Sequence, residues 1–259
     1  MKKFLIFCQE ILAYIEVYLY SKNRDYQSTR NSLVENGWST FNKNYSSLFP
    51  LDYEKTRKHS KYSSIYILSK QEINRLVISL FYKGKILKFI EDSMNMKYSI
   101  DFIAYYNTES VPENNKSKQY FANLWHNDSL FTKNTIKVFI LAHDTDLNHG
   151  PLNFINKNQS KTLIDKEDIS DQKIGNRDVN YFVGNMGDVC IINPKLCLHK
   201  AGLPTHKYNR NMIMVQLNPS RISSFKNDLY EKQFFLEPNL PFIRNLFRKK
   251  TTYSMPDTN

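Results

Sequence analysis

Two side chains that could share a metal ion lie two residues apart in LWHNDSLF, residues 124–131. In an extended strand, side chains at positions i and i+2 point to the same face, so His126 and Asp128 would stand side by side. A rise of about 3.3–3.4 Å per residue separates their Cα atoms by roughly 6.6–6.8 Å, which lets an imidazole and a carboxylate reach one ion. Two ligands do not complete a site, so a third must come from elsewhere in the chain.

The third ligand that we expect is His199, one of six histidines, in GDVCIINPKLCLHKAG at 187–202. A glycine-aspartate pair opens a predicted strand there and an asparagine-proline pair ends it. In a jelly roll a late strand returns beside an early one, which would bring His199 against His126 and Asp128. Two imidazoles and one carboxylate leave three octahedral positions open, as in non-haem Fe(II) oxygenases. A zinc hydrolase with a further histidine and a bound water stays open on ligand type alone.

Arg210 favours the first of these sites. It follows His199 by 210 − 199 = 11 residues and begins RNMIMVQL, a predicted and mostly apolar strand. Burying a guanidinium costs free energy unless an anion pairs with it. Its planar fork matches a carboxylate with two hydrogen bonds, so a dicarboxylate could chelate the metal with one end and meet Arg210 with the other. An exposed arginine at a strand end is the alternative interpretation.

A rival group of ligand types lies in AHDTDLNH at 142–149, with His143, Asp144, Asp146 and His149. Its spacing suits a loop better than a strand. We expect a turn in which both aspartates accept backbone hydrogen bonds, not a metal site.

The composition bounds the class of protein. A chain of 259 residues, 41% of them hydrophobic, suits a single domain. Only 7 glycines argue against a glycine-rich nucleotide-binding fold, and no run of about 18 apolar residues predicts a transmembrane helix. Three cysteines without C-x-x-C spacing disfavour a disulfide framework or a zinc knuckle. These features predict a cytoplasmic protein.

The net charge of +11 favours anionic partners. Anionic small molecules, acyl-CoA, phosphorylated sugars and anionic lipid all fit, and an overall bias toward Lys, Asn, Ile and Tyr explains the charge equally well. Nucleic acid is disfavoured, because neither zinc-finger spacing nor an aromatic-basic RNA-binding motif is present. The sequence carries no signal for an oligomeric state.

The hydrophobic patterns predict helices followed by strands. Residues 2–20 form an amphipathic helix in this reading and not a signal peptide, because Gln9, Glu10 and Glu16 interrupt the apolar run. Residues 71–97 predict one helix ending near Gly84 and a second short helix. The predicted strands are 98–107, 120–128, 135–142, 179–184, 187–193 and 210–217. This order predicts an α+β fold in which the helices brace one sheet of an antiparallel sandwich or barrel.

Four segments in chain order resemble the phytanoyl-CoA dioxygenase family of Fe(II)- and 2-oxoglutarate-dependent oxygenases. They are LWHND (124–128), IKVFILAHDTDLNHGPLNFI (136–155), GDVCIINPKLCLHKAG (187–202) and NRNMIMVQL (209–217). The resemblance implies a double-stranded β-helix, a jelly-roll or cupin-like core, with bracing N-terminal helices. We therefore expect one domain over 1–259: a mainly helical part at 1–97, the β core at 98–220, and a basic extension at 221–259 whose end is disordered.

The resemblance also implies the roles of single residues. His126, Asp128 and His199 would bind Fe(2+), and Arg210 would hold the distal carboxylate of 2-oxoglutarate. Asp128 retains the carboxylate that halogenating relatives lack, so hydroxylation is the expected outcome. His143 and His149 depart from the family pattern, which has a small polar residue and an Asn-Gly turn at these places.

The reaction so implied consumes 2-oxoglutarate and O2, releases succinate and CO2, and hydroxylates an unactivated C–H of a small or medium anionic molecule. Two alternatives stay open. One is a membrane-peripheral hydroxylase of a lipid-linked or lipopolysaccharide sugar, with residues 2–20 and 240–259 contacting an anionic membrane. The other is a non-catalytic or hydrolytic metal-binding jelly roll.

Overall fold

The computed structural model describes residue 15 and residues 31–220, except 42–44, 117, 119, 129–131, 166–168, 170–173 and 176–177. The helix expected at 2–20 thus lies outside the described residues apart from Ile15, and the basic extension at 221–259 lies outside them entirely. In the described part, no helix has the length and apolar character to cross a membrane.

Two antiparallel sheets form the centre of the molecule. The larger has seven strands in the order β1-β8-β5-β10-β4-β3-β2, and the smaller has three in the order β7-β6-β9. The strands are β1 (Trp38–Phe41), β2 (Tyr53–Ser60), β3 (Ser63–Leu68), β4 (Lys97–Glu109), β5 (Ile136–Leu141), β6 (Leu152–Phe154), β7 (Asn180–Phe182), β8 (Val189–Ile192), β9 (His199–Ala201) and β10 (Asn209–Ser220).

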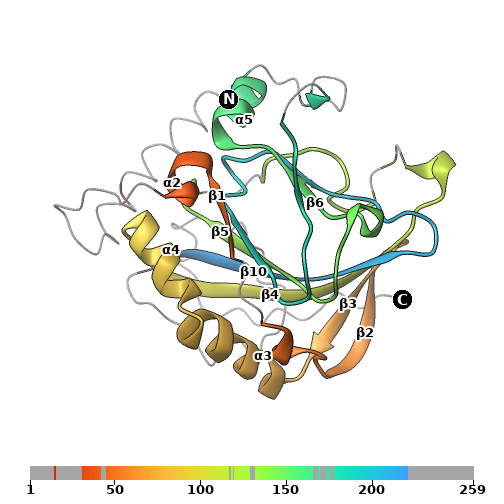
Figure 1. Cartoon of the computed structure of the whole chain (residues 1–259), viewed down its shortest axis with the longest axis horizontal. Coiled ribbons are helices and arrows are strands. Elements are labelled where there is room, and N and C mark those ends of the chain that lie inside the picture. The colour runs from red at the N-terminus through yellow and green to blue at the C-terminus, as the bar shows by residue number, and fades with distance from the viewer. Residues whose placement is uncertain are drawn as a thin grey trace, which may run out of the picture.

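Helices cover one face of the larger sheet, and the smaller sheet lies over its other face. Figure 1 shows α3 and α4 on one side of β4 and β10, and β6 on the other. The helices are α2 (Ser32–Asn36), α3 (Lys70–Val77), α4 (Ile86–Met94) and α5 (Lys157–Asp165), with the π-helix η2 (Ile78–Lys83) and the 3-10 turns η1 (Ser46–Leu48), η3 (Glu113–Asn115) and η4 (Leu147–His149). This arrangement confirms the predicted α+β jelly-roll class.

The helical hairpin at 70–94 matches its prediction. Ser69 caps α3, since its side chain accepts a hydrogen bond from the backbone N–H of Glu72 at 3.2 Å. The helix continues as η2 up to Gly84, and α4 follows. The predicted helix end near Gly84 and the second short helix are therefore confirmed.

Alternation along β5 decides which side chains face the cavity between the sheets. Ile136, Val138 and Ile140 belong to the large core under the helices. Phe139 belongs to the second core, between the two sheets, and Lys137 shares its face of the strand. A pleated strand between two layers therefore supplies both layers at once.

Two parts of the predicted strand map are wrong. Residues 120–128 form no strand; His126 makes only an isolated bridge there. The sequence reading also missed strands β1 to β3, which lie within 38–68 and extend the larger sheet at both edges, and β6 in the smaller sheet. The described part of 1–97 therefore holds strands as well as helices, and the larger sheet is not confined to 98–220. Edge strand β2, YEKTRKHS, has no apolar alternation, and its pairing with β3 makes it a strand.

We predict that Ile213→Ala lowers the free energy of unfolding by about 2–5 kcal/mol, since it leaves a cavity in the core. Ile213 lies in β10 and is 0% exposed. Urea denaturation measures the change. The matched control is Ile78→Ala, on a side chain that is 46% exposed, which should change the free energy by less than about 0.5 kcal/mol. Equal losses in the two variants would contradict this core assignment.

Candidate functional site

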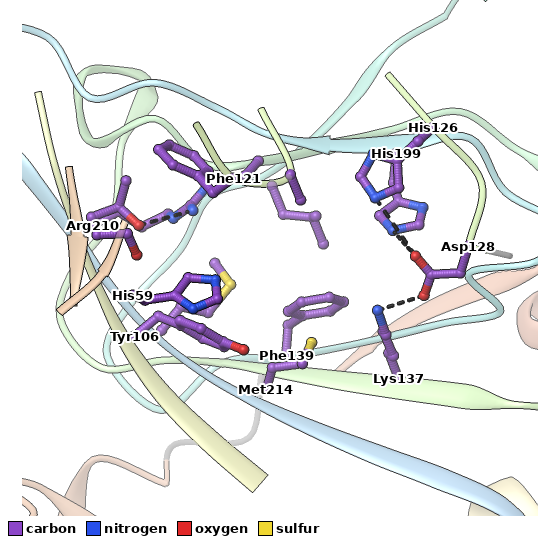
Figure 2. Close-up of a pocket in the computed structure, with 16 residues that line it drawn as sticks. His59, Tyr106, Phe121, His126, Asp128, Lys137, Phe139, His199, Arg210 and Met214 are labelled. Atoms are coloured by element: carbon purple, nitrogen blue, oxygen red, sulfur yellow. Dashed lines mark hydrogen bonds and ion pairs between the residues drawn. The ribbon is translucent and has the colours of Figure 1, made fainter. Parts of the chain in front are cut away.

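A cavity of about 220 Å³ lies between the two sheets. Residues of β4, β5 and β10 form its floor, and β6, β9 and the segment before Asp128 form its roof. The lining residues are His59, Ser63, Tyr106, Thr108, Phe121, Ala122, His126, Asp128, Lys137, Phe139, Leu152, His199, Ala201, Arg210, Met212 and Met214. Figure 2 shows Arg210 at one end of this cavity and His126, Asp128 and His199 at the other.

Backbone pairing brings the three predicted metal ligands together. The N–H of His126 donates to the carbonyl of His199 at 3.1 Å, and the N–H of His199 donates to the carbonyl of His126 at 2.9 Å. The N–H of Asp128 donates to the carbonyl of Pro194 at 3.0 Å. The segment that carries His199 therefore returns beside the early pair, as the jelly-roll reading predicted.

The side chains of these three residues converge. The Nε2 atoms of His126 and His199 each lie 3.6 Å from Oδ1 of Asp128, and the three possible ligand atoms all lie within 4.8 Å of one another. In the described part of the chain, no other three His, Cys, Asp or Glu side chains are grouped closely enough to hold a metal ion. The geometry therefore suits a small cation at this end of the cavity.

Hydrogen bonds fix both imidazoles in the form that a metal requires. Nδ1 of His126 lies 2.7 Å from the carbonyl oxygen of Leu124, and Nδ1 of His199 lies 3.0 Å from that of Cys197. A carbonyl oxygen can only accept, so Nδ1 of each ring is the donor, and Nε2 is the ring nitrogen left to bind a metal. Burial lowers the pKa of His199 to about 4, which keeps this imidazole neutral at pH 7.

Asp128 has a cationic neighbour that the sequence reading did not assign to it. Nζ of Lys137 lies 2.5 Å from Oδ2 of Asp128. Burial acts to raise the pKa of the Asp128 carboxyl, but the charge of Lys137 and its hydrogen bond to the carboxylate hold that pKa below its ordinary value. Asp128 is therefore a carboxylate at neutral pH. The signal for Lys137 was present in the sequence, as the one charged residue of the otherwise apolar IKVFIL.

Arg210 is buried, with 7% of its surface exposed. Nη1 donates to the carbonyls of Gly150 at 3.0 Å and Gly202 at 3.2 Å, and Nη2 donates to Oγ1 of Thr108 at 3.2 Å. Burial lowers the pKa of Arg210 to about 10, so the guanidinium stays charged at pH 7. Because Arg210 is buried, the alternative of an exposed arginine at a strand end is wrong. Its three hydrogen-bond partners are all neutral, so no anion in the described chain pairs with it.

The rival group at 142–149 is a turn. Asp144 Oδ1 accepts from the N–H of Met186 at 2.8 Å, and Asp146 Oδ1 accepts from the N–H of Asn148 at 2.8 Å. His143 Nε2 accepts from the N–H of Asn211 at 3.0 Å, so it satisfies a backbone donor of β10, the strand that carries Arg210. The predicted backbone-bonding role of both aspartates is confirmed.

Four aromatic residues line the cavity beside the two candidate ligand histidines, and the sequence reading assigned none of them to it: His59, Tyr106, Phe121 and Phe139. His59 is exposed and lies on edge strand β2, where it also lines the cavity, with its ring centroid 5.7 Å from that of Tyr106. Phe121 lines the cavity as well. The polar sequence of β2 gives no indication that His59 lies at the cavity, since only the sheet register brings it toward the site. His206 is exposed.

Comparisons with known proteins bear on the fold. No family model and no curated sequence matches the chain. HygX from Streptomyces hygroscopicus, solved with nickel, 2-oxoglutarate and hygromycin B bound, has a TM-score of 0.51 at 13% identity, over 75% of this chain and 87% of that one.

A second solved structure is similar to this chain to the same degree. The epimerase SnoN, in complex with Fe3+, alpha ketoglutarate and nogalamycin RO, has a TM-score of 0.51 at 10% identity, over 86% of this chain and 93% of that one. The chain shares their fold. At these identities the likeness shows the fold alone, and the chemistry must be argued from the residues.

We predict that His143→Ala lowers the free energy of unfolding by about 1–3 kcal/mol, because the N–H of Asn211 loses its acceptor. Urea denaturation at pH 7.5 measures this loss, and Mn(II) affinity should stay unchanged. His206→Ala removes the same side chain from an exposed position and is the control. A large loss of metal affinity in His143→Ala would instead support a metal site at 142–149.

Proposed function

We propose that this chain is an Fe(II)- and 2-oxoglutarate-dependent dioxygenase that hydroxylates an unactivated C–H of a small or medium anionic molecule. The narrower resemblance to the phytanoyl-CoA dioxygenase family is part of this proposal. One observation carries it: a His-Asp-His group and a buried arginine with neutral partners face the same cavity. HygX and SnoN, which share the fold, were solved with a metal ion and the same keto acid.

The arginine has donors left for a carboxylate. A guanidinium has five N–H groups, and three hydrogen bonds go to Gly150, Gly202 and Thr108. The remaining two donors are Nε–H, which is buried without a partner, and one N–H of Nη2. A carboxylate can accept from such a pair of neighbouring donors at once, with charge assistance. The distal carboxylate of 2-oxoglutarate supplies this anion.

The ligand set suits iron better than structural zinc. Closed zinc sites use four protein ligands, often cysteines, whereas three side chains converge here. Cys197 instead directs its Sγ to the carbonyl of Asn36, at 3.6 Å. Two neutral imidazoles and one carboxylate leave three positions for the keto acid and O2. His126, Asp128 and His199 are therefore the residues that would hold Fe(II).

The chain's residues orient the reactants and keep water out. Bound Fe(II) would supply the redox chemistry, in which substrate, 2-oxoglutarate and O2 give hydroxylated substrate, succinate and CO2. Arg210 would fix one end of the keto acid, so that its other end reaches the metal. Phe139, Leu152 and Met212 give the cavity an apolar lining, which would limit side reactions with water.

The charges of the cavity favour an anionic substrate. Its described lining carries one carboxylate, Asp128, against two cations, Lys137 and Arg210. A divalent metal ion and a doubly charged 2-oxoglutarate leave the balance positive. A carboxylate or phosphate on the substrate would offset this remaining charge. The membrane alternative depends on residues outside the described part, and no described feature favours it.

We predict that Asp128→Ala lowers Mn(II) affinity by more than about a hundredfold, because changes around metal ligands alone already cost about 10–100-fold. Isothermal titration under nitrogen measures this affinity, and succinate release should be lost with it. Asp146→Ala removes an exposed carboxylate from the turn and is the control. Wild-type metal affinity in Asp128→Ala would rule out this ligand.

We predict that Arg210→Ala weakens 2-oxoglutarate binding by about thirtyfold to several thousandfold, since a buried charged pair is worth about 2–5 kcal/mol. Anaerobic titration of the Fe(II) protein with 2-oxoglutarate, followed by the visible charge-transfer band, gives the dissociation constant. Fe(II) affinity should change by less than about threefold.

Arg75→Ala is the control for Arg210→Ala, since Arg75 pairs with Glu72 on the helical side of the sheet and does not line the cavity. A wild-type dissociation constant in Arg210→Ala would contradict the role of Arg210. A wild-type protein that never converts 2-oxoglutarate to succinate, with any substrate tried, would instead support the non-catalytic alternative.

A further inference from the structure

Lys137 occupies an unusual place for a lysine. It lies in β5, a central strand of the larger sheet between β8 and β10, among apolar neighbours. Its side chain is only 14% exposed and lines the cavity. Burying an ammonium group there costs free energy unless a specific partner repays it. That partner is Asp128, whose Oδ2 lies 2.5 Å from Nζ of Lys137.

The two oxygens of Asp128 face different groups. Oδ1 lies 3.6 Å from Nε2 of each imidazole, on the side where a metal would bind. Oδ2 faces Nζ of Lys137, which lies on the floor of the cavity. Figure 2 shows both contacts of the carboxylate as dashed lines. One oxygen of the Asp128 carboxylate thus faces the possible metal position, and the other contacts the ammonium group of Lys137.

We propose that Lys137 is a positioning residue that makes Asp128 a one-oxygen ligand and so keeps metal positions open for the cosubstrate. This inference rests on the proposed function. Carboxylates bind metal ions through one oxygen or through two. With Oδ2 held by Lys137, Asp128 offers Oδ1 alone, and three of the six octahedral positions remain for the keto acid and O2.

The charge of Lys137 makes a merely stabilising role a poor explanation. An ammonium group that pairs with a metal ligand repels the metal ion as well, and at short range this repulsion weakens metal binding. A neutral hydrogen-bond donor would hold the carboxylate without that cost. The same positive charge attracts a doubly negative cosubstrate, so Lys137 shifts the site's preference from the cation toward the complex of cation and anion.

The test compares wild type, Lys137→Met and Lys137→Arg, each loaded with Mn(II) under nitrogen. Methionine keeps the length of the side chain without a donor, and arginine restores the donor and the charge. Water proton relaxation counts the exchangeable waters on Mn(II), and titration calorimetry gives the affinities for Mn(II) and then for 2-oxoglutarate. Lys133→Met is the control, since it removes an equal charge four residues earlier from a side chain that does not line the cavity.

We expect about three waters on Mn(II) in wild type and one fewer in Lys137→Met, because Oδ2 takes a metal position. Lys137→Met should bind Mn(II) at least as tightly as wild type but bind 2-oxoglutarate at least about tenfold more weakly. Lys137→Arg should return the water count to the wild-type number, and Lys133→Met should match wild type throughout.

An unchanged water count in Lys137→Met would overturn the inference. If 2-oxoglutarate binding weakened all the same, Lys137 would contact the cosubstrate directly. Loss of Mn(II) binding in Lys137→Met would overturn it too, since the lysine would then be needed to form the metal site. A wild-type protein that binds neither Mn(II) nor 2-oxoglutarate would refute the proposed function itself, which distinguishes that failure from a failure of Lys137 alone.

Discussion

The pair of backbone hydrogen bonds between His126 and His199 is the constraint on which the rest of the site depends. These residues stand 199 − 126 = 73 positions apart, and the bridge sets their imidazoles side by side, with ring centroids 4.5 Å apart. Because each Nδ1 is tied to the carbonyl two residues earlier in its own chain segment, the backbone also sets the direction of each Nε2. Metal-binding geometry thus follows from main-chain pairing, which few side-chain substitutions disturb.

The larger sheet makes this arrangement stable and useful at once. Its strands bury one set of side chains under α3 and α4 and turn the other set toward the smaller sheet. The first set supplies most of the apolar burial. The second set can then include the polar groups of the cavity, Lys137 and Arg210 among them, because the larger core offsets what their burial costs. Each buried charge also has hydrogen-bond or ionic partners in the cavity wall.

Low identity to HygX and SnoN, 13% and 10%, limits what similarity can carry. A fold can host unrelated chemistry, so function must be argued from the site. Here that argument uses the direction of Nε2 in His126 and His199, the two contacts of the Asp128 carboxylate, and the buried Arg210 with its neutral partners. Each can be removed by one substitution and read by binding alone, without knowledge of the substrate.

The sequence by itself predicted the three side chains that converge at one end of the cavity, the helical hairpin at 70–94 and five strands that the structure contains, because local spacing and apolar periodicity report on them directly. It misassigned 120–128 as a strand and missed β1 to β3 and β6, since short or polar strands acquire their structure from partners distant in the sequence. Only the tertiary structure decided that Lys137 meets Asp128, that His59 lines the cavity and that Arg210 is buried among neutral acceptors. Those facts depend on register and on contacts between segments far apart in the chain, which no local pattern encodes.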